Sequence, residues 1–224
     1  MGTTRLDIYN AALLICGERF LADLTENREP RRLLDHVWNT NGNDYCLEQS
    51  QWHFAMRTVM IDYEPSIQPA FGYKRAFTKP TDWMQTSAVC SDEFFRTPLL
   101  GYSDEPGYWY ADIYPIYVKY VSNDIGFGGD LSRWPQTFVD YVACYYASKI
   151  IAKLGGDRTA QEEKIYGPPG APEKGLLHHT LHVAKAKAAF GQPAQYWAQG
   201  NWTRARRGKR GGYNDRGNSG SLMG

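Results

Sequence analysis

The hydrophobic pattern of the chain changes abruptly within residues 48–63, EQSQWHFAMRTVMIDY. The first four residues are polar and are typical of the end of a helix. From Thr58 to Tyr63, apolar and polar side chains alternate, which is the pattern of a half-buried strand. The chain therefore joins a helical part to a sheet at three residues, Trp52, His53 and Phe54. An enzyme could place its chemistry at such a joint, whereas a structural protein would use it to hold a helix on a sheet.

Four segments have apolar residues at the three- and four-residue spacing of a helix. They are predicted at residues 4–16, from about Glu29 to Tyr45, at 135–154 and at 172–190. Thr3 or Thr4 can cap the first helix and Gly17 can end it, whereas Gly42 weakens the second without ending it. The third is apolar almost all round. We therefore expect it at the centre of a bundle, or buried by a neighbouring subunit.

Proline and glycine interrupt short alternating runs between residues 56 and 122. These runs predict strands at 59–63, 73–77 and 116–121, within an antiparallel sheet of about four to six strands. We interpret residues 101–115, GYSDEPGYWYADIYP, as a tyrosine-rich loop or an irregular edge of that sheet.

The order of these elements predicts an α+β fold. The N- and C-terminal helices form a bundle, an antiparallel β-sheet lobe is inserted between them, and an extended C-terminal arm follows. The expected boundaries are 1–55 and 131–192 for the two parts of the bundle, 56–130 for the β lobe and 193–224 for the arm.

Charge is distributed unevenly along the chain. Residues 199–224 carry six basic side chains and one acidic side chain, a net charge of +5, so the other residues carry −4 of the total of +1. The last residues, GKRGGYNDRGNSGSLMG, lack hydrophobic periodicity and predict a segment that does not fold alone. Mixtures of arginine and glycine bind nucleic acid, but basic arms also bind acidic protein surfaces. The composition leaves both alternatives open.

The four cysteines are far apart in the sequence: Cys16, Cys46, Cys90 and Cys144. We expect free, mostly buried thiols, no disulfides and a reducing folding compartment. No apolar run reaches the roughly 20 residues that span a bilayer, and the N-terminus lacks the apolar core of a signal peptide. No membrane association is expected.

Three histidines are the most suggestive cluster for metal chemistry: His178, His179 and His182. On a helix, His178 and His182 lie one turn apart, but no third ligand accompanies them. We therefore expect exposed side chains on the face opposite Leu177 and Leu181.

Other residue patterns do not indicate catalysis either. His36 and His53 have no partner in a recognisable triad order. The sequence GFGGD at 126–130 lacks the lysine of a phosphate-binding loop and is interpreted as a flexible turn. Adjacent carboxylates such as Glu162 and Glu163 point apart. We predict no catalytic, cofactor-binding or metal site, and a hydrolase acting on cell-wall glycan is only a third alternative.

Five short motifs follow one another along residues 1–206. The first is the opening helix with its glycine stop and leucine-rich continuation: Asn10, Ala11, Leu13, Gly17, Leu21, Leu24, Thr25 and Glu26. The second is a W-x-F-A element at the joint: Trp52, Phe54 and Ala55. The third and fourth are a proline–aspartate element, Pro80 with Asp82, and the long helix 134–154 with its Gly-Gly-Asp exit. The fifth is the closing tryptophan-to-arginine element: Trp202, Arg204 and Arg206. Together these motifs resemble the tail tubular protein A family, the head-to-tail adaptors of short-tailed bacteriophages.

The resemblance implies a structural protein of the virion neck, assembled in the host cytoplasm. It implies a homo-oligomeric ring of twelve copies between the portal protein and the tail nozzle protein, with DNA passing through the lumen without sequence-specific binding. It implies no enzymatic activity and no cofactor. The sheet lobe would face the nozzle and the helical lobe the portal, with a portal-binding arm: Trp202, Arg204, Arg206, Arg207, Lys209 and Arg210.

One matching element and two departures bear on how closely the chain resembles the family. Trp52, Phe54 and Ala55 would form a structural joint that seats the second helix against the sheet. In contrast, Lys79 stands where the family usually has a leucine before the proline, and YGPPGAPEKG resembles an insertion between the last helices.

Overall fold

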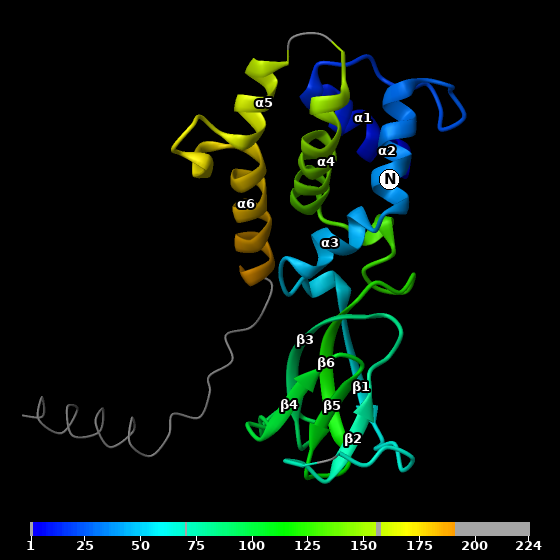
Figure 1. Ribbon diagram of the computed structural model, residues 1–224, viewed down its shortest axis with the longest axis vertical. Coiled ribbons are helices and arrows are strands. Elements are labelled where there is room, and N and C mark those ends of the chain that lie inside the picture. The colour runs from blue at the N-terminus through cyan, green and yellow to red at the C-terminus, as the bar shows by residue number, and fades with distance from the viewer. Residues whose placement is uncertain (1, 70, 156–157, 191–224) are drawn as a thin grey trace, which may run out of the picture. The chain divides into compact units, whose positions relative to one another are not determined.

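A computed structural model describes residues 2–69, 71–155 and 158–190 (Figure 1). The chain begins with α1 (Arg5–Cys16), α2 (Glu29–Asn39) and α3 (Gly42–Glu48). Six strands follow: β1 (Met56–Ile61), β2 (Arg75–Thr78), β3 (Trp83–Cys90), β4 (Tyr102–Glu105), β5 (Tyr108–Ala111) and β6 (Ile116–Ser122). The last elements are α4 (Gln136–Ile150), α5 (Thr159–Tyr166) and α6 (Leu176–Phe190). The fold is α+β, as predicted, with the strands inserted between two sets of helices. The arm predicted at 193–224 lies outside the described residues.

Helix α1 begins and ends at the residues that the sequence indicates. The Thr4 hydroxyl accepts a hydrogen bond from the backbone N–H of Asp7, and the Asp7 carboxylate accepts from the backbone N–H of Thr4. This reciprocal cap satisfies two N–H groups that a helix start leaves unpaired. At the other end, Gly17 has φ of 72°, a left-handed conformation that glycine adopts without steric cost.

The second predicted helix is in fact two helices, α2 and α3. The chain turns at Asn41, which has φ of 61°. A Cβ atom at Gly42 would lie 2.7 Å from the carbonyl oxygen of Val37 and 2.9 Å from its Cγ1. Glycine is therefore required for the close approach of the two helices. The prediction that Gly42 leaves one helix unbroken was wrong.

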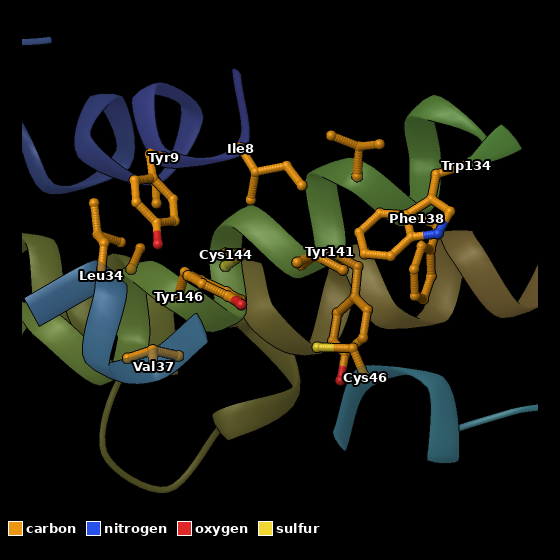
Figure 2. Packing of buried hydrophobic residues seen from close by; sticks show 14 of the residues in the cluster. Ile8, Tyr9, Leu34, Val37, Cys46, Trp134, Phe138, Tyr141, Cys144 and Tyr146 are labelled. Carbon is orange, nitrogen blue, oxygen red and sulfur yellow. The ribbon is translucent and has the colours of Figure 1, made fainter. Parts of the chain in front are cut away.

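Helix α4 is the centre of the helical core and contacts all five other helices of the described chain. Figure 2 shows Tyr9 of α1 and Leu34 of α2 directed toward Tyr146 of α4. The Tyr9 and Tyr146 ring centroids are 6.2 Å apart. On α4 itself, only Gln136, Asp140 and Lys149 are exposed. The apolar surface of this helix is thus buried within one chain, which decides between the two alternatives left open by its sequence.

The strands form two three-stranded antiparallel sheets in place of the single sheet expected. One sheet has the order β1–β6–β3 and the other has the order β2–β5–β4. A second hydrophobic core contains side chains from both sheets, including Phe77, Val89, Trp109 and Val118. Residues 101–115, expected to be a loop or irregular edge, contain the β4–β5 hairpin. The strands therefore form a small β sandwich.

Strand β6 contributes to both cores of the molecule. Ile116, Val118 and Tyr120 are buried in the sandwich. Val121, on the opposite face of the strand, is buried in the core of the helices. The two cores are therefore joined through one continuous strand at the end where β6 pairs with Met56 of β1.

Candidate interaction surfaces

The joint between the helices and the sandwich contains the buried side chain of Trp52. Its indole Nε1–H donates to the carbonyl oxygens of Cys46 (3.2 Å) and Leu47 (2.9 Å). These carbonyls lie in the last turn of α3, and the Cys46 carbonyl also accepts from the backbone N–H of Gln49. The indole ring centroid lies 4.7 Å from that of Phe138 on α4. One side chain therefore ties α3 and α4 to the segment that leads into β1.

Phe54 and Ala55 complete this contact. The Phe54 ring lies 5.0 Å from Phe138 between centroids, and Ala55 is fully buried. His53, between them and Trp52, is exposed. The geometry brings the three predicted joint residues together, while their importance for assembly stays a prediction.

The return connection from β6 to α4 is closely packed. A Cβ atom at Gly128 would lie 2.3 Å from the carbonyl oxygen of Ser122 and 2.9 Å from the Ala55 Cβ. The Trp134 indole Nε1–H donates to the carbonyl oxygen of Gly128 (2.8 Å), and its ring packs edge-on against Phe138 at 4.8 Å. The GFGGD segment is a turn, as interpreted, and its glycines allow a tight crossing of the chain.

Asp82 lies at the end of the sandwich next to the joint, and its carboxylate is ionised. Its carboxylate accepts hydrogen bonds from Arg57 (2.8 Å), Tyr120 (3.2 Å) and Ser122 (2.5 Å). Burial raises the pKa of this carboxyl, but the hydrogen bonds from Ser122 and Arg57 outweigh it and hold the pKa below its usual value of 3.8. Asp82 therefore connects the start of β3 to β1 and β6.

Lys79 is part of a buried polar network in the sandwich. Its Nζ lies 3.6 Å from the ring centroid of Trp83 and 5.4 Å from that of Trp109, and it forms an ion pair with Asp104. The Thr86 hydroxyl donates to Asp104 (2.5 Å) and accepts from both indole N–H groups (3.0 Å each). Two aromatic faces and a carboxylate thus accommodate the Lys79 cation within the sandwich.

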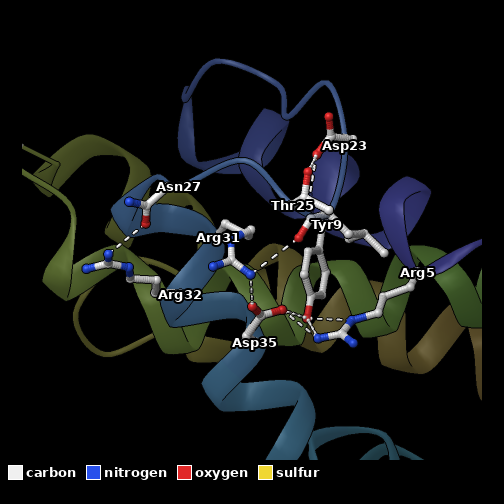
Figure 3. A network of polar contacts seen from close by, with 9 residues as sticks. Arg5, Tyr9, Asp23, Thr25, Asn27, Arg31, Arg32 and Asp35 are labelled. Carbon is white, nitrogen blue, oxygen red and sulfur yellow. Dashed lines mark hydrogen bonds and ion pairs between the residues drawn. The ribbon is translucent and has the colours of Figure 1, made fainter.

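A third network joins α1 to α2 (Figure 3). The Asp35 carboxylate accepts from Arg5 (2.5 Å), Arg31 (2.6 Å) and the hydroxyl of Tyr9 (3.0 Å). The Arg5 guanidinium also lies 4.7 Å from the ring centroid of Trp38. This carboxylate is shared by donors from both helices and fixes one against the other.

These networks hold the fold together, and each carboxylate is already surrounded by donors of the chain. Within the described ranges, no group of three or more His, Cys, Asp or Glu side chains is placed to hold a metal ion. His178, His179 and His182 are exposed on α6, as predicted. No helix among those placed has the length and apolar character needed to cross a bilayer.

Large apolar side chains are exposed at one end of the sandwich. They lie in the loops that join β1 to β2, β3 to β4 and β5 to β6: Tyr63, Phe71, Phe94, Leu100 and Tyr114. Phe71 is 90% exposed and Leu100 is 92% exposed. The strand register brings the three loops to the end where Ile61 pairs with Ile116, opposite the joint. We call this end the apolar tip.

A groove lies between α3, α4, α5 and the start of α6, with a volume of about 340 Å³. Its lining includes four tyrosines and two basic side chains: Tyr45, Tyr141, Tyr145, Tyr166, Lys149 and His178. The Tyr45 and Tyr145 rings stack with centroids 4.7 Å apart, and the Lys149 Nζ lies 5.1 Å from the Tyr145 ring. Burial raises the pKa of Tyr145 to about 12, so its hydroxyl is neutral near pH 7. We call this feature the tyrosine groove.

The sequence did not identify either surface. The groove combines residues from four helices, and the tip combines three loops, so only the folded chain brings them together. The one signal available was the presence of apolar residues beside loop-forming residues, as in PLLG at 98–101. The arm residues predicted to bind a portal, Trp202, Arg204, Arg206, Arg207, Lys209 and Arg210, lie outside the described residues.

Comparison with known proteins adds no identification. No protein-family model matches the chain, and no curated protein matches it.

Proposed function

We propose that this chain is a structural head-to-tail adaptor of a short-tailed bacteriophage, as its five motifs resembling the tail tubular protein A family suggest. Twelve copies form a ring between the portal protein and the tail nozzle protein, and DNA passes through the lumen without sequence-specific contacts. The chain acts without catalysis and without a cofactor. It is assembled in the host cytoplasm and resides in the neck of the virion.

The apolar tip is the observation that carries this proposal. Contiguous exposed apolar surface on a soluble protein marks a contact site. Loops that project from a rigid scaffold are the usual place for such a site. Phe71, Leu100 and Tyr114 project from three different loops of one sandwich, which supports a protein partner at this end. In the proposed assembly that partner is the nozzle.

The connection between the lobes also supports an adaptor. Strand β6 belongs to both cores, and Trp52 packs the segment before β1 against α4. Mechanical load on the tip is thus passed to the helices through packed side chains as well as through the backbone. A protein that connects two larger assemblies requires such continuity.

The charge distribution suits a channel for DNA. Outside residues 199–224 the chain carries a net charge of −4. Affinity for DNA comes mainly from basic side chains that neutralise phosphates. An acidic body provides few such contacts, so DNA can slide past it.

Electron microscopy of the purified protein, alone and mixed with its portal, tests the proposal. We expect ring-shaped density stacked on the portal. Persistent monomers beside intact, unoccupied portals would contradict the proposal. A variant with Phe71→Ser and Leu100→Ser should still join the portal but lose the nozzle. The control Ile125→Ser, at an exposed residue of the β6–α4 connection at the opposite end of the sandwich, should retain both partners.

The basic segment 199–224 favours a second candidate, a nucleic-acid-binding module. A salt titration of DNA binding, with and without residues 200–224, separates the two functions. A steep salt dependence that disappears with the segment would favour the nucleic-acid module. Weak binding that is unchanged by the deletion would favour the adaptor.

A further inference from the structure

The β1–β6–β3 sheet turns one of its faces away from the core of the sandwich. Val118 and Tyr120 of β6 are buried in that core, so Tyr117 and Lys119, which alternate with them, point outward. Both outward side chains are partly exposed. Met60 of β1 lies beside Tyr117 and is 59% exposed. We call this surface the basic face and define it by four residues: Thr58, Met60, Tyr117 and Lys119.

The β2–β5–β4 sheet has an outward face on the other side of the sandwich. Trp109 of β5 is buried in the core, so Tyr108 and Tyr110 point outward, with ring centroids 6.2 Å apart. Tyr108 pairs with Glu105 of β4 and with Thr78 of β2, and both of these residues are exposed. We call this surface the acidic face and define it by four residues: Thr78, Glu105, Tyr108 and Tyr110.

The two faces carry complementary charges that the chain does not neutralise itself. Neither Lys119 nor Glu105 takes part in the ion pairs of the described ranges. The Glu105 carboxylate accepts a hydrogen bond from the Ser103 hydroxyl (3.1 Å), which leaves its charge in place. Each face also presents aromatic surface beside its charged group, a combination found where proteins contact each other.

The charged residues lie at matching heights along the strands. Strand β5 ends at Ala111 and β6 begins at Ile116, and the connection between them is at the apolar tip. Tyr108, with Glu105 beside it, is three residues before Ala111, and Lys119 is three residues after Ile116. Because a strand advances about 3.3 Å per residue, both charges lie about 10 Å from the tip.

The strands of the two sheets are also in matching order. The Thr86 hydroxyl of β3 donates to the Asp104 carboxylate of β4 (2.5 Å), so these two strands face each other across the sandwich. At the other side, the backbone N–H of Glu64, just after β1, donates to the carbonyl oxygen of Ala76 in β2 (2.8 Å). A second sandwich stacked on the first therefore places its β1, β6 and β3 over β2, β5 and β4.

We propose that the basic face of one copy packs on the acidic face of the next copy. The Tyr117 ring and Met60 pack against Tyr110, and the Lys119 ammonium pairs with the Glu105 carboxylate. Lys119 then lies over β5, and Glu105 is one strand, about 4.8 Å, to the side, which the long lysine side chain spans. The inference rests on the proposed function, because it names a contact between subunits of the ring.

This contact suits a ring in which all copies are at one height. The two faces are on opposite sides of the same sandwich, so each copy offers one face to each neighbour. The apolar tip of every copy points the same way and stays free for the nozzle. A contact between unlike surfaces is head-to-tail, and repeated copies close into a ring when the rotation between neighbours allows it.

Chemical cross-linking of full-length protein tests the contact. One preparation carries Thr58→Cys on the basic face and the other carries Thr78→Cys on the acidic face, while the four native cysteines are buried. A short bismaleimide should join the two at least about tenfold faster than it joins Thr58→Cys to the exposed control Lys187→Cys, because a specific contact raises the effective thiol concentration. Equal rates, with and without added portal, would overturn the proposal.

A charge exchange then tests the pair between Lys119 and Glu105. Lys119→Glu in the Thr58→Cys partner, or Glu105→Lys in the Thr78→Cys partner, should each slow cross-linking several-fold, because like charges then meet. Both changes together should restore most of the rate. The control Lys119→Arg keeps the charge and should leave the rate nearly unchanged. Slowing by each single change without recovery in the combination would refute the assigned ion pair.

Other arrangements of the subunits give different results. Rapid cross-linking of Thr58→Cys to itself would show that two basic faces meet in a symmetric dimer, which overturns the contact between unlike faces. Rings on the portal without cross-linking of Thr58→Cys to Thr78→Cys refute the contact and leave the adaptor function. Rapid cross-linking of these two variants beside unoccupied portals supports the contact and refutes the adaptor function.

Discussion

Replacing Trp52 with alanine should be among the most damaging single changes in the described part of the chain. Trp→Ala substitutions in a core cost about 3–5 kcal/mol, because burial is lost and a cavity remains. The Trp52 side chain is fully enclosed and packs on Phe138. It also donates to two carbonyl oxygens at the end of α3, whose loss adds about 1 kcal/mol. The expected loss of about 4–6 kcal/mol approaches the whole stability of a small domain, about 5–15 kcal/mol.

Urea unfolding followed by far-ultraviolet circular dichroism measures this loss. The matched variant Trp52→Phe keeps an aromatic ring beside Phe138 but removes the N–H donor. It should cost only about 1–3 kcal/mol, through the lost indole hydrogen bonds and the smaller ring. The difference between the variants separates the packing of the joint from its hydrogen bonds.

A small effect of Trp52→Ala would refute the reasoning. If the unfolding free energy fell by less than about 1 kcal/mol and the variant still assembled on the portal, the joint could not be the contact that holds the two lobes. An equal loss in Trp52→Phe and Trp52→Ala would instead assign the whole effect to the hydrogen bonds.

Three further predictions concern the packing and titration of the fold. Gly128→Ala should lower the unfolding free energy by about 1–3 kcal/mol through steric overlap, whereas Gly155→Ala, with no atom near its added Cβ, should be close to neutral in the same urea titration. Because the pKa of Asp82 is lower in the folded state than in the unfolded state, its charge stabilises the fold above about pH 4. This contribution is lost as the pH falls through the folded pKa, and Asp82→Asn should flatten that part of the stability curve; an unchanged curve would contradict the assignment. Burial raises the pKa of Cys144 to about 11 and that of Cys16 to about 12, so thiol reagents at pH 8 should label them only at the rate of unfolding, and rapid labelling of the native protein would be the contrary result.

Features set by local chemistry were predictable from the sequence. The limits of α1 follow from a capping threonine and a terminal glycine, which act within a few residues of themselves. The continuous apolar character of 135–154 likewise predicted a central helix, and α4 occupies that place. These predictions succeeded because the pattern in each segment is strong enough to outweigh its surroundings.

The elements that were missed have weak or interrupted patterns. In β3 the register shifts between Trp83 and Gln85 and again between Thr86 and Ala88, so apolar residues do not alternate along the strand. The β4–β5 hairpin has tyrosine on both faces, which hides its period. In α5 only Ile165 is buried, so the helix has no apolar stripe to identify it.

The break between α2 and α3 shows a different limit. Glycine in a helix costs about 1 kcal/mol, and local reasoning therefore allowed the helix to continue through Gly42. The decisive fact is the approach of Val37 to that glycine, which depends on how two helices pack. Such a contact depends on the packing of two segments, so the sequence of either segment alone does not reveal it.

The position of α4 changes which residues can be assigned to a contact with a partner. An apolar helix suggested burial by a neighbouring subunit, but contacts with α1, α2, α3, α5 and α6 already cover it. Its buried side chains therefore cannot supply an interface without unfolding the core, and of this helix only groups at the groove, such as Tyr145 and Lys149, remain accessible. The surface left for partners comprises groups that the chain does not cover itself, above all the apolar tip and the tyrosine groove. An assembly formed by this protein must use such exposed surface, and variants there should alter association while leaving the unfolding free energy nearly unchanged.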